Sequence, residues 1–190
     1  IVTSEVEKNA YLNLTNGASV VVNPQNGDIL AMVGSKDYSD SVSGNFNVAT
    51  ALRQPGSSIK AVTYSLALSQ GYTAATIIED SPVSYSSPGG VPYVPVNYDG
   101  TFRGRMSLRI ALANSINIPA VKILAKLGVQ NMVDLGRKMG ITTWENSSDY
   151  GLAITLGSGE VKMVDMAQVY SVLANSGRKV DLNPIMKLTD

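Results

Sequence analysis

The sequence predicts an α/β protein of the α+β type, in which an antiparallel sheet is flanked by helices. The stretch 18–34, "ASVVVNPQNGDILAMVG", has two runs rich in β-branched and apolar residues around an Asn-Gly pair, a strong hairpin signal. Later segments combine apolar periodicity with helix start and stop signals. These helical segments are residues 57–69, 106–115, 118–128, 129–140 and 160–175.

The hairpin over 18–34 needs more sheet around it than the sequence supplies. Val20 and Val22 fall on one face and Val21 on the other, so the first strand is apolar on both sides. A strand of this kind belongs inside a larger sheet, and a two-stranded hairpin alone is marginal. The remaining strands are not evident in the sequence.

The other segments have local reasons for their predicted structure. Thr3 or Ser4 can cap a short helix over 3–14, and Ser107 and Pro119 mark the starts of two later helices. Gly71, Gly128, Gly140 and Gly177 stand where four helices are expected to end. Between them, residues 80–104 are rich in proline and glycine and predict an irregular loop, which Asn97 and Asp99 are expected to brace.

Composition excludes several functions. The 190 residues suit one domain, and 15 basic residues balance 15 acidic ones without a basic block, which argues against a nucleic-acid partner. Without histidine or cysteine there is no Ser-His-Asp triad, thiol nucleophile or disulfide, and no cofactor or metal site is expected. No apolar run approaches the length of a membrane span. The base of an enzyme built on this chain must be Lys, Asp, Glu or Tyr.

Ser57 and Lys60 form the first candidate pair. Three residues apart on a helix, they lie on one face with Cβ atoms roughly 5–6 Å apart. A lysine that is partly buried near a helix start has a lowered pKa and can take the proton of a serine hydroxyl. Spacing alone is a weak signal, because Ser176 and Lys179 repeat it across a helix end. An ordinary solvated lysine and a capping serine would give the same pattern.

Ser115 and Asn117 form the second candidate pair, in "NSINIP" between two predicted helices. A hydroxyl and an amide on such a corner can project together into a cleft. They can equally serve to satisfy the helix ends, and the spacing does not separate the two interpretations.

Four blocks in order give these pairs their meaning: "NPQNGDILAMVG", "RQPGSSIK", "PVNYDGTFRGRMSLRIALANSINIPAVKI" and "GSGEVKMVDMAQVYSVLANSG". Together they resemble the transpeptidase domain of penicillin-binding proteins. The Arg-Gln-Pro-Gly-Ser-Ser and Asn-Tyr-Asp-Gly forms look most like the bifunctional class A proteins. The resemblance extends from about residue 3 to 190 and implies a penicillin-binding/β-lactamase-like fold.

The resemblance implies a D,D-transpeptidase that cross-links peptidoglycan stem peptides through a serine acyl-enzyme and is acylated by β-lactams. Ser57 matches the nucleophile, Lys60 its base, and Ser115 the hydroxyl that relays the proton. Asn117 and Ser58 match substrate-binding positions. The enzyme would act on the extracytoplasmic face of the bacterial envelope, anchored to the membrane by a segment outside this chain.

The third motif of the family, Lys-Thr-Gly or Lys-Ser-Gly, does not occur, since none of the nine lysines begins such a triplet. We therefore expect residues 1–190 to be the N-terminal portion of one transpeptidase domain, with the hairpin at about 18–34 and a helical subdomain at about 57–177. The glycosyltransferase domain and the C-terminal strands would lie outside it. A second chain or a C-terminal fragment would complete the site.

Two other functions are compatible with the residues. A β-lactam sensor or a β-lactamase could use the same serine chemistry on the same framework. A non-catalytic or truncated scaffold of the cell envelope would explain the absence of the third motif. The forms "RQPGSS" and "NYDG" favour the transpeptidase.

Overall fold

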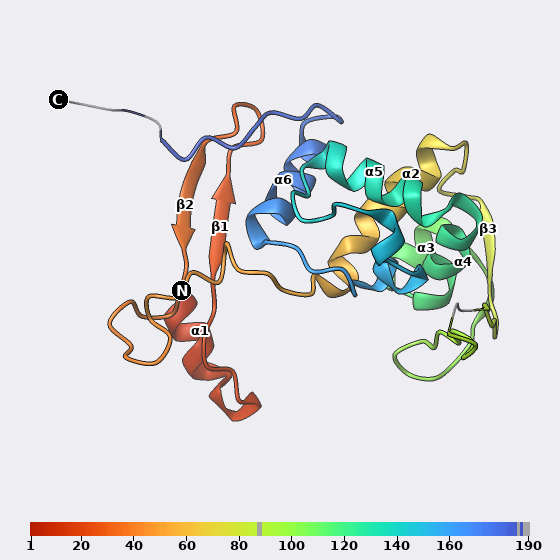
Figure 1. Cartoon of the computed structure of the whole chain (residues 1–190), viewed down its shortest axis with the longest axis horizontal. Coiled ribbons are helices and arrows are strands. Elements are labelled where there is room, and N and C mark those ends of the chain that lie inside the picture. The colour runs from red at the N-terminus through yellow and green to blue at the C-terminus, as the bar shows by residue number, and fades with distance from the viewer. Residues whose placement is uncertain (87–88, 186, 188–190) are drawn as a thin grey trace. The chain divides into compact units, whose positions relative to one another are not determined.

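The computed structural model describes residues 1–86, 89–185 and 187 (Figure 1). Its chain forms two compact units, each of which draws on more than one stretch of sequence. Unit 1 contains residues 1–53, 137–143 and 160 onward, and unit 2 contains residues 54–136 and 144–159.

Unit 1 contains the predicted hairpin. Strands β1 (Ser19–Val22) and β2 (Ile29–Val33) pair antiparallel, and a bulge separates the pairs of Val21 and Val22. The turn depends on Gly27, whose φ of 79° suits glycine and whose N–H donates to Asn23 O at 2.8 Å. The hairpin prediction is therefore confirmed.

Helix α6 (Met163–Ala174) packs against this hairpin. It contacts β1 (Figure 1). Val21 remains 48% exposed and Leu30 55% exposed, so part of the apolar sheet surface is uncovered by the described residues. This agrees with the expectation that the strands belong to a larger sheet.

Two helix predictions in unit 1 need their boundaries corrected. The helix expected over 3–14 is α1 (Val2–Lys8) followed by a 3₁₀ turn (Ala10–Leu12). The helix expected over 160–175 begins only at Met163, because the chain before it is extended and Val161 forms an antiparallel bridge with Arg53.

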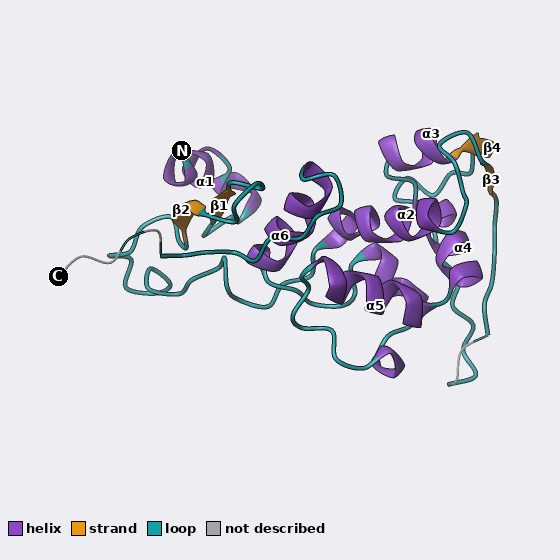
Figure 2. Ribbon diagram, turned by 90° about the horizontal axis from the view of Figure 1, so that it is seen from above, coloured by secondary structure: helices purple, strands orange, loops and turns teal. Residues whose placement is uncertain are grey.

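Unit 2 is mainly helical (Figure 2). A 3₁₀ turn (Gly56–Ile59) runs directly into α2 (Lys60–Ser69). The unit continues through α3 (Leu108–Ala113), α4 (Asn117–Leu127) and most of α5 (Val129–Met139), and then through two 3₁₀ turns (Ser147–Asp149 and Leu152–Leu156).

Unit 2 also holds two strands that the sequence did not reveal. Strand β3 (Ile77–Asp80) pairs antiparallel with β4 (Gly104–Ser107), at the two ends of the expected loop. Both strands are only four residues long, and glycine or acidic residues make up half of β3 and part of β4, so neither has a continuous β-rich run. The helix expected at 106–115 consequently starts at Leu108, with Ser107 as its N-cap as predicted.

The core of unit 2 joins these elements. It is a cluster of buried side chains from α2, α3, α4 and the β3–β4 pair. The members are Tyr64, Ala67, Ile78, Met106, Leu108, Ala111, Ile116, Ala120 and Ile123. Because the cluster contains residues of both α2 and α4, it packs these two helices together.

Two isoleucine-to-alanine substitutions, one in the core and one at the surface, should lower the free energy of unfolding by different amounts. Ile123→Ala removes a side chain that is 0% exposed and should cost about 2–5 kcal/mol of unfolding free energy. Ile110→Ala, on α3 at 50% exposure, should cost less than half as much. Urea unfolding of the two variants measures the difference, and equal losses would contradict this assignment of the core.

Candidate active site

Three polar side chains predicted from separate motifs meet in unit 2. Lys60 Nζ donates to the Ser115 carbonyl oxygen at 2.6 Å, to Ser115 Oγ at 3.1 Å and to Asn117 Oδ1 at 2.7 Å. Lys60 is only 1% exposed, so it is not the solvated lysine that spacing alone allowed. An ammonium group has three donor protons, and here each has an acceptor.

Ser57 lies one turn before Lys60, in the 3₁₀ turn that leads into α2. Residues three apart in a 3₁₀ helix eclipse one another, so both belong to the same face. The Ser57 side chain is exposed, and the described hydrogen bonds include none between its hydroxyl and Lys60. The structure thus joins Lys60 to Ser115 and Asn117 and leaves the Ser57 hydroxyl open to a reactant.

The start of α2 is held by a close backbone approach. A Cβ on Gly157 would lie 2.4 Å from the backbone nitrogen of Gly56, so only glycine fits there. One turn along α2, the hydroxyls of Thr63 and Thr155 are 2.6 Å apart, and both side chains are fully buried. The 3₁₀ turn of residues 152–156 and the glycine after it therefore hold the first turns of α2, and with them Lys60, in place.

Ser115 occupies the corner between α3 and α4 with a φ of 53°. This left-handed conformation is uncommon for serine and costs roughly 1–2 kcal/mol. It is held by two backbone bonds, from Ser115 N to Leu112 O at 2.9 Å and from Ile116 N to Ala111 O at 2.9 Å. The corner presents both oxygens of Ser115 to the same amine, as strained residues at functional sites often do.

Burial lowers the pKa of the Lys60 amine to about 8. Lys60 and Asn117 are the first residues of α2 and α4, and the positive ends of the two helix dipoles also disfavour an ammonium ion. The amine can therefore lose its proton near neutral pH.

Loss of that proton changes what the amine can do. A neutral amine keeps two N–H donors, which suffice for the two short bonds to Ser115 O and Asn117 Oδ1. The lone pair of the amine can then face either Ser115 Oγ, the more distant partner at 3.1 Å, or the hydroxyl of Ser57. Such an arrangement can accept a proton from one hydroxyl and return it through another.

A cavity of about 190 Å³ opens beside Ser115 and Asn117. Its lining also includes Tyr98, Asp99 and Arg103. Asp99 and Arg103 form an ion pair at 2.6 Å, and Thr101 N donates to Asp99 Oδ1 at 3.1 Å, so Asp99 braces this loop as expected. The cavity thus has a polar wall beside Ser115 and Asn117.

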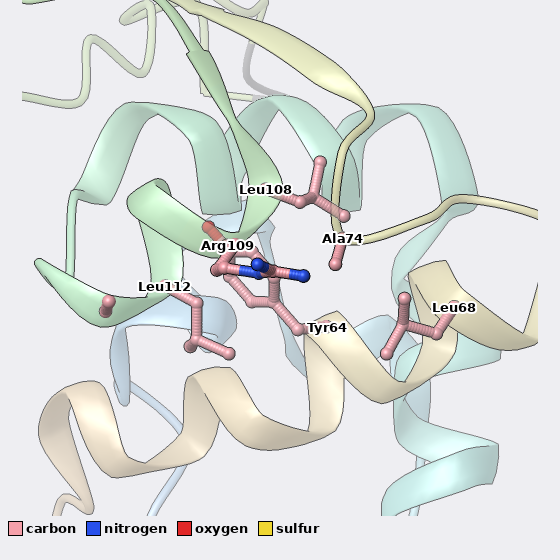
Figure 3. Close-up of a pocket in the computed structure, with 7 residues that line it drawn as sticks. Tyr64, Leu68, Ala74, Leu108, Arg109 and Leu112 are labelled. Atoms are coloured by element: carbon pink, nitrogen blue, oxygen red, sulfur yellow. The ribbon is translucent and has the colours of Figure 1, made fainter.

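A second cavity of about 340 Å³ lies elsewhere in unit 2, between α2 and α3 (Figure 3). Apart from Arg109, its walls are mainly apolar, with Leu68, Leu108 and Leu112 among them. The one hydroxyl in its lining is that of Tyr64, and burial raises the pKa of this phenol. The lining offers no serine or lysine, so this cavity is not the reactive centre.

Ser58, the residue after the candidate nucleophile, has a hydroxyl that bonds to the backbone of the preceding turn. Ser58 Oγ donates to Pro55 O at 2.6 Å, and its predicted part in substrate binding stays a prediction.

Among the residues that the structure describes, there is no group of three or more His, Cys, Asp or Glu side chains placed to hold a metal ion. Within the same described ranges, none of the helices has the length and apolar character that crossing a bilayer requires.

Sequence reasoning missed one component of the site. Asp80 is fully buried and accepts two bonds from Asn97 Nδ2, at 2.8 and 3.0 Å. Asn97 was expected to brace the loop, and it also accepts the backbone N–H of Asn117 at 3.0 Å. A carboxylate at the end of a short strand carries no spacing signal that links it to a helix so far along the chain.

Comparison with known proteins agrees with this geometry. The family described as "Penicillin binding protein transpeptidase domain" matches residues 17–190. The chain therefore belongs to the transpeptidase domain family of penicillin-binding proteins, and the predicted fold class and the resemblance to class A proteins are confirmed.

The chain is similar to several proteins named penicillin-binding protein 1A. One from Neisseria meningitidis is 38% identical over 180 residues, which is 93% of this chain and 22% of that protein. The crystal structure of penicillin-binding protein 1A from Haemophilus influenzae matches with a TM-score of 0.76 and 34% identity, over 84% of this chain and 23% of that one. PonA1 from Mycobacterium tuberculosis, solved in complex with penicillin V, matches with a TM-score of 0.75 and 25% identity, over 95% and 50%. The chain thus spans about a fifth of the curated relatives it matches.

The lowered pKa of Lys60 predicts how stability depends on pH. The folded protein releases this proton near pH 8, whereas the unfolded chain holds it to about 10.5. Stability relative to Lys60→Met should therefore rise between about pH 8 and pH 10, by up to about 1.4 kcal/mol per pH unit. Urea unfolding of both proteins across this range measures the effect. A difference that stays flat would show that Lys60 titrates alike in both states.

Proposed function

We propose that the protein containing this chain is a serine D,D-transpeptidase that cross-links peptidoglycan stem peptides and is acylated by β-lactams. The observation that carries the proposal is the buried Lys60 amine bonded to both Ser115 and Asn117, one turn after the exposed hydroxyl of Ser57. Membership of the transpeptidase family supports the same reaction.

In the proposed acylation, neutral Lys60 takes the proton of Ser57 as Ser57 Oγ attacks the carbonyl carbon of the scissile amide. The backbone N–H of Ser57 donates to the oxyanion that forms. The proton then passes from Lys60 through Ser115 to the amide nitrogen, and the C–N bond breaks. A stem peptide releases its C-terminal residue, whose amine is the leaving group. A β-lactam ring opens, and its leaving amine stays part of the acyl group on Ser57.

In the proposed second step, the amine of another stem peptide attacks the ester carbon of the acyl-enzyme. The amine gives up a proton along the same path in reverse, and Ser57 Oγ leaves with it. A new peptide bond joins the two stem peptides. Asn117 and Ser58 bind the amides of the donor peptide in this scheme.

The missing third motif fits the same proposal. The proposed domain continues beyond the parts described here, through a C-terminal fragment or a second chain with the Lys-Thr-Gly or Lys-Ser-Gly strand. Half-exposed Val21 and Leu30 on the hairpin support this, because further strands would cover them. The proposed place of action is the extracytoplasmic face of the bacterial envelope, which peptidoglycan substrates require.

The nucleophile has a direct test in the protein that contains this chain. Ser57→Ala should abolish covalent labelling by a fluorescent penicillin, because no oxygen remains to form the ester. Ser69→Ala is the matched control at the other end of α2, where the hydroxyl only donates to Leu66 O at 2.8 Å. The control should be labelled like the wild type.

The labelling is read on a denaturing gel, with thermal unfolding to confirm that both variants fold. Labelling that survives Ser57→Ala would reject Ser57 as the nucleophile. A folded wild-type protein that takes up no penicillin would reject the proposed function itself.

A further inference from the structure

A buried carboxylate and a buried amide lie next to the start of α4, where Asn117 contacts Lys60. Asp80, the last residue of β3, is 0% exposed, and Asn97, in the loop between β3 and β4, is 3% exposed. Asn97 begins the Asn-Tyr-Asp-Gly form, but the family resemblance assigns no role to either residue. Buried polar side chains are costly unless their bonding groups are satisfied, so the contacts of this pair define its role.

The hydrogen bonds fix the orientation of the Asn97 amide. Its Nδ2 donates to both carboxylate oxygens of Asp80, at 2.8 and 3.0 Å, and to Thr101 O at 2.8 Å. The Nδ2 side must therefore face Asp80, and Oδ1 must face the other way. Asp80 is held in turn by the backbone N–H of Arg103, which donates to Oδ2 at 2.9 Å.

The oxygen of Asn97 faces the start of α4. It accepts the N–H of Asn117 at 3.0 Å and that of Ile118 at 3.2 Å. The N-cap residue of α4 is Ile116, which has no side-chain acceptor, so these N–H groups lack a local cap. Asn97 supplies the missing cap from a loop about twenty residues earlier in the chain.

The same region fixes the Asn117 side chain. Its Nδ2 donates to Val96 O at 3.0 Å, next to Asn97, and its Oδ1 then reaches Lys60 Nζ at 2.7 Å. The contact with Lys60 thus depends on where the backbone of Asn117 lies. A displacement of about 1 Å would break it, and shifts of that size can cost about 100-fold in rate.

We propose that Asp80 and Asn97 are positioning residues of the transpeptidase site. Asp80 orients the Asn97 amide, Asn97 caps α4, and the capped helix holds Asn117 against Lys60. This proposal rests on the proposed function. In the proposed mechanism, neither Asp80 nor Asn97 touches the reacting atoms.

The pair can be tested by exchanging its donor and acceptor. Asp80→Asn places the amide donors of two asparagines opposite each other, or forces Asn97 to turn its donors toward α4. Asn97→Asp keeps an acceptor for α4 but opposes two carboxylates. Each single variant should lower the rate of penicillin acylation by about 10- to 100-fold in the protein that contains this chain.

The double variant D80N/N97D restores a matched pair. The new amide at 80 can donate to the new carboxylate at 97 and still accept the Arg103 N–H, while the carboxylate accepts the two N–H groups of α4. Thr101 O loses its donor, and the Arg103 guanidinium loses the carboxylate of Asp80 that lies 4.0 Å away. The double variant should therefore recover most of the lost acylation rate, although it carries both changes.

A control separates positioning from stability. Asp165 is likewise buried, at 4% exposure, and accepts the backbone N–H of Thr142 at 3.1 Å in unit 1. Asp165→Asn should lower the melting temperature and leave the acylation rate unchanged. If the Asp80 and Asn97 variants behave like this control, or if the double variant acylates no faster than the single ones, positioning is rejected.

A second measurement decides the structural part even if the wild type proves unreactive. Amide hydrogen exchange at Asn117 and Ile118 should be faster in Asp80→Asn, where the Asn97 oxygen no longer faces these N–H groups, and slow again in the double variant. Unchanged exchange in Asp80→Asn would overturn the proposal. An unreactive wild type with the expected exchange pattern would instead reject the proposed function.

Discussion

The site depends on one lysine amine held out of water between three oxygen acceptors. Lys60 Nζ is bound by both oxygens of Ser115 and by the side-chain amide oxygen of Asn117. Burial lowers its pKa to about 8, and the acceptors keep the group in place in either protonation state. A lysine in water would stay charged at neutral pH and could not act as a base. In the proposed mechanism, this environment takes the place of the histidine that the chain lacks.

The rest of unit 2 maintains this environment. Its apolar core links α2, which carries Lys60, to α4, which begins with Asn117. Local contacts then set the finer geometry. Gly157 against Gly56 fixes the start of α2, and the left-handed conformation of Ser115 turns its oxygens toward the amine. Packing thus supplies the approximate placement, and glycines, strain and capping supply the accuracy that acid–base chemistry needs.

The sequence was sufficient for the elements with strong local signals. The hairpin, the helix that follows Pro55-Gly56 and the Ser107 cap all follow from turn and capping chemistry, and the structure confirms them. Ser57, Lys60, Ser115 and Asn117 could be named because ordered blocks of residues resemble a known family. The structure brings three of these four into direct contact.

What the sequence could not reveal depends on pairing at a distance. Strands β3 and β4 are only four residues long, and they pair with each other across a long loop. The contact of Asn97 with α4 joins residues that share no periodic pattern, so no window of sequence contains it. The spacing of Ser57 and Lys60 likewise gave no information on burial, which is what separates a base from a surface lysine.

The most direct test of this account is the pH dependence of penicillin acylation in the protein that contains this chain. If neutral Lys60 is the base, the acylation rate constant should rise about tenfold per pH unit from about pH 6 and level off near pH 8. A rate constant that stays level over this range, with Ser57 still the labelled residue, would show that the proton of Ser57 goes elsewhere.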